Sequence, residues 1–107
     1  MEIVVVDRFT VTKEALPVLL EKSSAIQSIL SAVPGFIEGH VYQREETGAD
    51  PDIFTIAVWR DRECIEKAKK EVAAFLAKNN INMQEMLGSL GISMTRSIFT
   101  REPFVSR

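Results

Sequence analysis

Two polar aromatic residues, His40 and Tyr42, lie two positions apart in the stretch VPGFIEGHVYQ and are the only histidine and tyrosine of the chain. A neutral imidazole, which titrates at about pH 6.5, suits a general base that removes a proton from a phenolic hydroxyl. Tyr42 could donate a hydrogen bond to an oxygen of the same substrate. The structural alternatives are a surface or interface histidine and an amphipathic tyrosine at a sheet edge.

Asp7 and Trp59 are further candidates. Asp7 interrupts the apolar run IVVVDRF and is a second potential base, independent of His40; alternatively it forms a salt bridge with a residue such as Arg96. Trp59 ends the apolar run IFTIAVW, and strand periodicity places it on one face with Thr55. Its indole either fills the core or forms a pocket wall that stacks on a flat aromatic ligand.

Apolar side chains could complete such a pocket. Phe36 opens the strand-like run that holds His40. Met83 and Met86 are flexible and polarisable, so they either join the core or cover the mouth of a pocket for apolar ligands. Cys64 is the single cysteine and is expected to be inert.

The order of elements predicts how these residues are positioned. Runs of β-branched and aromatic residues predict strands, and apolar residues at steps of three or four predict helices. Thr12, Asp61 and Asn82 are the expected helix caps. The expected elements are strands at 2–11, 36–45, 53–60 and 92–101, helices at 12–35, 62–79 and 81–91, a turn at 46–52 and a tail at 102–107.

This order is typical of an α+β, ferredoxin-like βαββαβ domain spanning 1–107, with an antiparallel four-stranded sheet and its helices on one face. Strand register decides where His40 points. If positions 36, 38, 40 and 42 all face the helices, His40, Tyr42 and Trp59 share one pocket, and this orientation is our expectation. In the opposite orientation Glu38 and His40 lie on the other sheet face.

The first and third strands are apolar on both sides, although helices can cover only one face of the sheet. A monomer rarely leaves an apolar patch of several hundred Å² bare. At ~25 cal/mol per Å², covering it contributes on the order of ten kcal/mol before association costs. We therefore expect a homodimer whose sheets pack face to face through Val4, Val6, Phe54, Ile56 and Val58.

Composition and charge exclude several classes of protein. The net charge of −2 argues against nucleic-acid partners and anionic membranes, and no apolar run is long enough to span a bilayer. A lone cysteine and the absence of an export signal predict the cytoplasm. No metal-ligand spacing or nucleotide or flavin motif is seen, so no metal or cofactor is expected.

The stretches VPGFIEGHVYQ and IFTIAVWRDRECIEKA resemble the antibiotic biosynthesis monooxygenase domain of the dimeric α+β barrel superfamily. The shared pattern is a Gly-Phe pair opening the second strand, an apolar third strand ending in Trp59, and an acidic residue, Asp61, at the start of the next helix. The resemblance implies a dimeric α/β barrel with a ligand site between sheet and helices in each subunit. It also implies, for some members, oxidation of phenols, anthrones or quinols by O₂ without a bound cofactor.

Individual residues match this family unevenly. Trp59 matches the strand-end tryptophan of the polyketide monooxygenases, but Thr55 stands where they carry a polar amide and Ile65 where they carry a tyrosine. The asparagine, tryptophan and haem-ligating histidine of the haem-degrading branch fall on or near Asp7, Ala68 and Lys78. The resemblance therefore does not favour haem degradation.

The leading hypothesis is a cofactor-independent monooxygenase acting on a phenolic or quinol-type aromatic. His40 or Asp7 would deprotonate the substrate, while Tyr42, Thr55 and the Trp59 N–H would stabilise the developing oxyanion. Two alternatives stay open: a non-catalytic, small-molecule-binding or stress-associated dimer, and a cofactor-free isomerase on the same fold.

Overall fold

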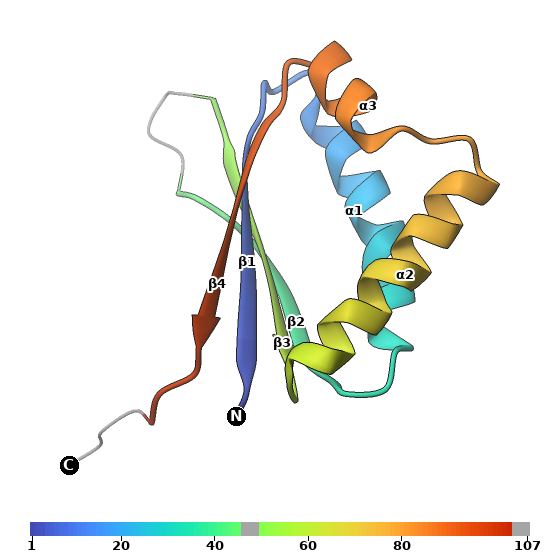
Figure 1. The fold of residues 1–107 in the computed structure, drawn as a ribbon. Coiled ribbons are helices and arrows are strands. Elements are labelled where there is room, and N and C mark those ends of the chain that lie inside the picture. Colours follow the sequence, from blue (N-terminus) through green and yellow to red (C-terminus); the bar gives the residue numbers. More distant parts are fainter. Residues whose placement is uncertain (46–49, 104–107) are drawn as a thin grey trace.

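The computed structural model describes residues 1–45 and 50–103, which form four strands and three helices. In chain order these are β1 (Ile3–Thr10), α1 (Leu16–Ser31), β2 (Phe36–Gln43), β3 (Asp52–Trp59), α2 (Arg62–Lys78), α3 (Met83–Ser89) and β4 (Ser93–Thr100). The antiparallel sheet has the order β2-β3-β1-β4, and the helices lie on one side of it (Figure 1). The predicted ferredoxin-like fold is confirmed. The expected turn and tail lie partly outside the described residues.

Side-chain caps fix where two of the helices begin. Asp61 and Asn82 each accept a hydrogen bond, of 3.1 Å, from the backbone N–H three residues further on, as predicted. Thr12 makes the same contact at 3.2 Å, but in a turn that precedes α1. The first helix therefore begins at Leu16 and not directly after Thr12, with Pro17 in its first turn.

Two apolar clusters form the core between sheet and helices. Leu19 is the buried leucine of α1, whereas Leu20 is exposed. The first cluster lies beneath the start of α2 and contains Ile3, Val33, Trp59, Cys64, Ile65 and Ala68. The second lies at the other end of the sheet, near α3, and contains Val11, Ala15, Leu19, Ile53, Leu87 and Ile92. No helix in the described part of the chain is long and apolar enough to cross a membrane.

Gly35 and Cys64 join the α1–β2 connection to the first turn of α2. Gly35 has φ +95°, a conformation that side chains disfavour, and a Cβ added there would overlap the Cys64 sulfur. The thiol is buried, and Arg60 Nη2 donates a hydrogen bond to its sulfur at 3.4 Å. The absence of a side chain at Gly35 is thus what lets α2 dock at this end of the sheet.

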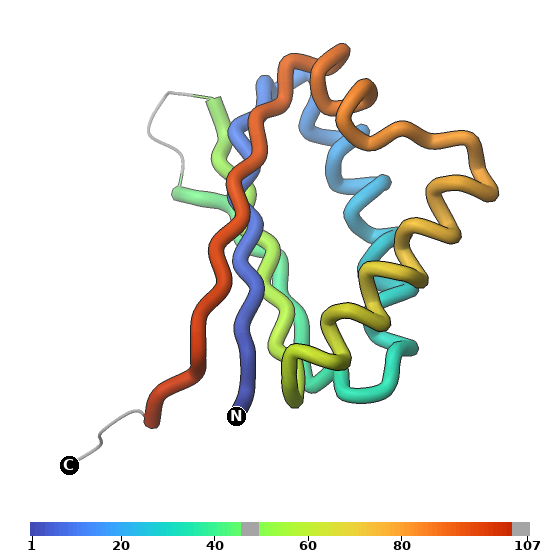
Figure 2. Tube along the Cα trace, viewed as in Figure 1, coloured from blue at the N-terminus to red at the C-terminus, as the bar shows by residue number. Residues whose placement is uncertain are grey.

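The second helix is tilted relative to the sheet. Its first turn lies near the end of β3, whereas its C-terminal end lies well away from the strands (Figure 2). The helices also leave β4 largely uncovered, since all its residues are exposed, including Met94 and Ile98 on the helix side of the sheet. The space between the two layers therefore widens from the start of α2 toward its end.

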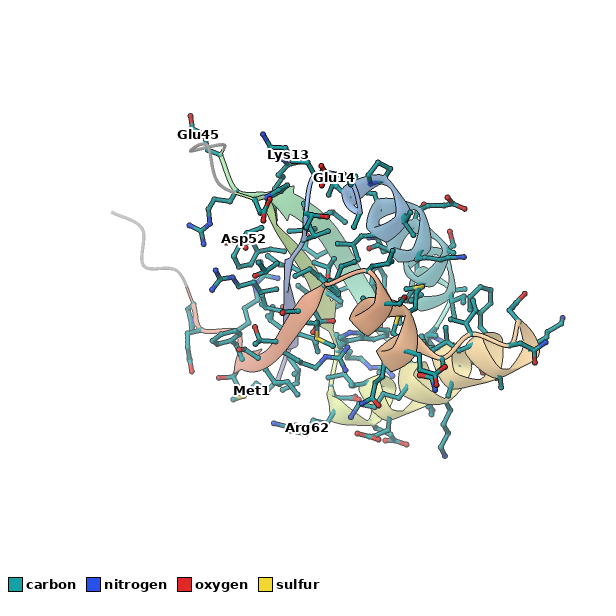
Figure 3. All side chains as sticks on the ribbon, turned by 90° about the horizontal axis from the view of Figure 1, so that it is seen from above. Met1, Lys13, Glu14, Glu45, Asp52 and Arg62 are labelled. Carbon is teal, nitrogen blue, oxygen red and sulfur yellow. The ribbon has the colours of Figure 1, made fainter. Side chains whose placement is uncertain are left out.

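Asp52 joins three segments at one end of the sheet, on the side away from the helices (Figure 3). Its carboxylate accepts hydrogen bonds from Arg8 at 2.9 Å, Arg44 at 3.1 Å and Thr10 at 3.2 Å. The hydrogen bond from Arg8 lowers the pKa of Asp52, with further lowering by Arg44 and Thr10 and an opposing effect of burial.

This lowered pKa makes the contribution of Asp52 to stability dependent on pH. The contribution is complete above the unfolded-state pKa of about 3.9 and is lost as the pH falls through the lower folded-state value. In urea unfolding, the advantage of the wild type over Asp52→Asn should be constant above about pH 5 and shrink below about pH 3.9. A difference that does not change between pH 7 and pH 3 would contradict this assignment.

Candidate functional site

A cavity of about 650 Å³ lies between the helix side of the sheet and the three helices. This volume is within the range of about 300–1,000 Å³ that is usual for small-molecule sites. Its closed end is aromatic, since Trp59 is only 2% exposed and packs edge-on against Phe36 with ring centroids 5.3 Å apart. Met83 and Met86 of α3 line the same cavity. Its walls are therefore mainly apolar.

Small residues on the sheet leave room for the aromatic pair. A Cβ added to Gly39 would lie 2.9 Å from the Cζ atom of Phe36, so a side chain at this position would require the ring to shift. Ala57, the cross-strand neighbour of Gly39, is also small and lines the cavity. The position of Phe36 against Trp59 thus depends on the glycine in the strand.

A polar row crosses the floor of the cavity. Thr55, Asp7 and Arg96 are cross-strand neighbours on β3, β1 and β4, and all three line the cavity. Arg96 donates two hydrogen bonds to Asp7, from Nε to Oδ1 at 2.7 Å and from Nη2 to Oδ2 at 2.9 Å. The Asp7 side chain is 14% exposed and that of Arg96 is 46% exposed. The hydrogen bonds to Asp7 raise the pKa of Arg96, which stays charged.

The first helix contributes a polar side to this mainly apolar cavity. Ser23, Gln27 and Ser31, spaced four residues apart on α1, all line it. Gln27 Nε2 donates a hydrogen bond to Ser23 Oγ at 2.8 Å. The cavity therefore offers neutral hydrogen-bonding groups on one side and the charged pair of Asp7 and Arg96 on the other.

A β-bulge in β2 decides where His40 and Tyr42 point. Phe36 pairs with Trp59, but the register shifts between Phe36 and Glu38, so that Glu38, His40 and Tyr42 pair with Val58, Ile56 and Phe54. Because paired residues point to the same side of a sheet, Phe36 faces the helices and the other three face away. The expectation that the whole series faces the helices was wrong, because the extra residue of a bulge inverts the alternation.

On this outer side of the sheet, His40 and Tyr42 join a polar group. Their rings stack with centroids 5.8 Å apart, and His40 Nε2 lies 3.5 Å from Glu38 Oε2. Arg101 donates hydrogen bonds to Glu38 at 3.3 Å and to Glu2 at 3.0 Å. His40 also borders the cavity, but the alternation means that it does so through its main chain.

Seven of the eight predicted site residues line the cavity, namely Asp7, Phe36, Thr55, Trp59, Met83, Met86 and, through its main chain, His40; Tyr42 does not. The predicted pairing of Asp7 with Arg96 is confirmed, but Arg96 was not expected to line a site. The polar side of α1 was also missed, although Ser23, Gln27 and Ser31 at four-residue spacing could have indicated it. Within residues 1–45 and 50–103, no group of three or more His, Cys, Asp or Glu side chains could hold a metal ion.

Solved structures share this fold over nearly the whole chain. A variant of SnoaB, a cofactor-independent oxygenase from Streptomyces nogalater, superposes with a TM-score of 0.74 at 23% identity, covering 99% of this chain and 98% of that one. A conserved protein from Methanosarcina mazei gives 0.72 at 15% identity, covering 95% and 94%. A heme-degrading protein from Mycobacterium tuberculosis gives 0.63 at 16% identity, covering 99% and 100%. Different activities occur on the fold, which therefore does not distinguish between them.

The amino-acid sequence itself gives a family assignment. No curated protein matches the chain. The family model described as antibiotic biosynthesis monooxygenase, however, matches residues 2–77, which run from β1 almost to the end of α2. This match includes Asp7, Phe36, Thr55 and Trp59 of the cavity. The chain therefore belongs to the antibiotic biosynthesis monooxygenase family.

Proposed function

We propose that the protein is a cofactor-independent monooxygenase that oxidises a flat phenolic or quinol-type substrate inside the cavity. The observation that carries this proposal is the cavity itself, which combines an aromatic wall of Trp59 and Phe36 with a charged pair, Asp7 and Arg96, on its floor. Family membership supports the reaction class. The buried, unpaired Cys64 is compatible with action in a reducing cytoplasm, where we place the activity.

In the proposed reaction a phenol and one O₂ give a quinone and one water. A base removes the hydroxyl proton, and the electron-rich anion that results reduces O₂. One oxygen atom forms a bond to a ring carbon, the O–O bond breaks, and the second oxygen leaves as water with the two hydrogens lost by the substrate. The substrate supplies all the electrons, so the reaction requires no external reductant.

Asp7 is the base that we assign, because it is the carboxylate among the described residues that line the cavity. The Trp59 N–H and the Thr55 hydroxyl are assigned to the developing oxyanion. No described residue hydrogen-bonds to the indole nitrogen, and no fully buried side-chain nitrogen or oxygen lacks a partner, so the Trp59 N–H keeps some contact with solvent although the residue is only 2% exposed. His40 and Tyr42 point away from the cavity and receive no role within the same subunit.

Oxygen consumption with a panel of hydroquinones and anthrones tests this proposal. Asp7→Asn should lower kcat/KM by at least about 100-fold, the usual scale for loss of a general base. His40→Ala is the control for the other sheet face and should change the rate by less than about threefold. No oxygen consumption with any member of the panel, or an equal loss in the two variants, would contradict the proposal.

Non-catalytic binding is the second candidate, and the pairing of Asp7 favours it. Both Asp7 oxygens already accept a hydrogen bond from Arg96, so fewer of their lone pairs are available to take up a substrate proton. Binding of aromatics without any product would select this function. Product formed equally well without O₂ would instead indicate an isomerase, because an oxygenase must stop under anaerobic conditions.

We also propose that a second copy of the chain covers the outer side of the sheet. Val4, Val6, Phe54 and Ile56 are half-buried there and Phe99 is exposed. Val58, which the sequence placed in a bare patch, is already 4% exposed within one chain. Glu38, the cross-strand neighbour of Val58 on β2, forms an ion pair with Arg101, which directly follows β4.

Charge on this outer face supports a two-fold arrangement. Glu2 and Glu38 lie at the end where β1 begins, with Arg101 between them. Arg8 and Arg44 lie at the opposite end and share Asp52. Among these side chains, acidic ones outnumber basic ones at the first end, and basic ones outnumber acidic ones at the second. Two copies packed face to face about a two-fold axis that lies between the sheets, perpendicular to the strands, place unlike ends together, which favours a homodimer.

A further inference from the structure

The guanidinium of Arg96 has hydrogen-bond donors left for a ligand. Nε and one N–H of Nη2 bind Asp7, and no further hydrogen bond of this side chain is made to the described residues. A guanidinium has five N–H donors in a fixed plane, so Nη1 and the second N–H of Nη2 are not bound by any residue in 1–45 or 50–103. The side chain is 46% exposed and lines the cavity, where a ligand can reach it.

Asp7 holds this guanidinium in place. Its carboxylate is largely buried on β1, one of the two inner strands. It accepts hydrogen bonds from two nitrogens of Arg96, which fixes the plane of the guanidinium. A planar, fixed fork of N–H groups is the geometry that recognises a carboxylate through two parallel hydrogen bonds. Because Arg96 is already ordered before a ligand arrives, binding costs less side-chain entropy than with a free arginine.

The charge around the cavity is opposite in sign to that of the whole protein. Among the described lining residues, Lys22, Lys69 and Arg96 are cationic and Asp7 is the carboxylate. Lys69 lies 3.3 Å from Glu66, which is outside the lining, and Lys22 is half-buried. The chain as a whole has a net charge of −2. A positively lined cavity in an acidic protein favours entry of an anionic ligand.

Trp59 lies four residues along β3 from Thr55, which shares a cross-strand row with Arg96. Four residues of a strand span about 13 Å. A molecule of two or three fused aromatic rings with an acidic group at one end would therefore contact Trp59 with its rings while its charge lies near Arg96.

We propose that the cavity binds aromatic carboxylates and that the free edge of the Arg96 guanidinium anchors the carboxylate group. This inference rests on the proposed function, because it names the substrate class of the same cavity. It makes Arg96 a specificity-determining residue that selects acids over neutral molecules with the same ring system.

The test compares 2-naphthoate with its neutral methyl ester. Trp59 is the only tryptophan of the chain and lines the cavity, so quenching of its fluorescence measures binding of both ligands. The wild type should bind the acid at least tenfold more tightly than the ester, and this ratio should fall as salt is raised. Arg96→Gln should weaken binding of the acid at least tenfold and leave the ester unchanged.

Two further variants separate loss of the anchor from loss of structure. Arg96→Gln combined with Asp7→Asn leaves no unpaired charge on the cavity floor and should also bind both ligands equally. Arg101→Gln removes an arginine from the other side of the sheet and should keep the preference for the acid.

Each outcome bears on the inference. Equal affinity for acid and ester in the wild type would overturn it, and so would a preference that survives in both Arg96 variants. If the acid is preferred but no aromatic substrate consumes oxygen, the inference stands and the oxygenase proposal fails. If neither ligand quenches Trp59, the inference and the aromatic cavity on which it rests are both overturned.

Discussion

Ile56→Asp is expected to yield a monomer at micromolar concentration, where the wild type is a dimer. Ile56 lies near the middle of the outer sheet face, between its cross-strand neighbours Val6 and His40. In a two-fold contact the variant would bury two carboxylates, one from each subunit, without a cationic partner. Burial of an unpaired charge costs several kcal/mol for each ion, which is comparable to what the whole apolar contact contributes.

Light scattering coupled to size exclusion measures this change directly. Val18→Asp is the matched control, because Val18 is an exposed apolar residue on α1 and lies outside the sheet. It should remain dimeric, and both variants should keep the circular dichroism of the wild type. A monomeric wild type, or a dimeric Ile56→Asp protein, would mean that the outer face is not the contact between subunits.

Trp59→Ala is expected to lower the free energy of unfolding by about 3–5 kcal/mol, the usual cost of removing a buried aromatic ring. Trp59 is 2% exposed, and it belongs to the core cluster that also contains Ile3 and Ile65. Its loss also removes the edge-on support of Phe36. The large indole is therefore required for the fold at this end of the sheet as well as for the wall of the cavity.

Urea unfolding followed by circular dichroism checks this value, since the variant lacks tryptophan fluorescence. Leu20→Ala on the exposed side of α1 is the control and should change stability by about 0.5 kcal/mol or less. Trp59→Phe should lose less stability than Trp59→Ala, because it keeps an aromatic ring at this position. A cost below about 1 kcal/mol for Trp59→Ala would show that the ring is not part of the core.

The order of elements could be predicted because each signal is local. Short β-branched runs, the caps Asp61 and Asn82, and the Pro-Gly stop after α1 each depend on a few neighbouring residues. The same local periodicity placed Thr55 and Trp59 on one side of β3, and both line the cavity. The local sequence pattern was therefore enough to predict the fold and the part of the candidate site that lies on β3.

The orientation of His40 could not be obtained in this way. It depends on the bulge between Phe36 and Glu38, which is a property of how β2 pairs with β3. A glycine inside a strand often marks a bulge or a close approach, and Gly39 was a signal of this kind. The cavity volume and the role of Arg96 depend on the tilt of α2 and on the pairing of β1 with β4, both of which are tertiary features.

The contact between Gly35 and Cys64 has a practical consequence. Cys64, the only native cysteine, is buried beneath the start of α2. A cysteine introduced at an exposed position would therefore react with maleimide dyes far faster than Cys64 does. Spectroscopic labels could then be attached at one chosen position without first removing Cys64, whose replacement by a larger side chain would strain the backbone at Gly35. Association of two labelled subunits could then be followed by measuring the distance between their labels.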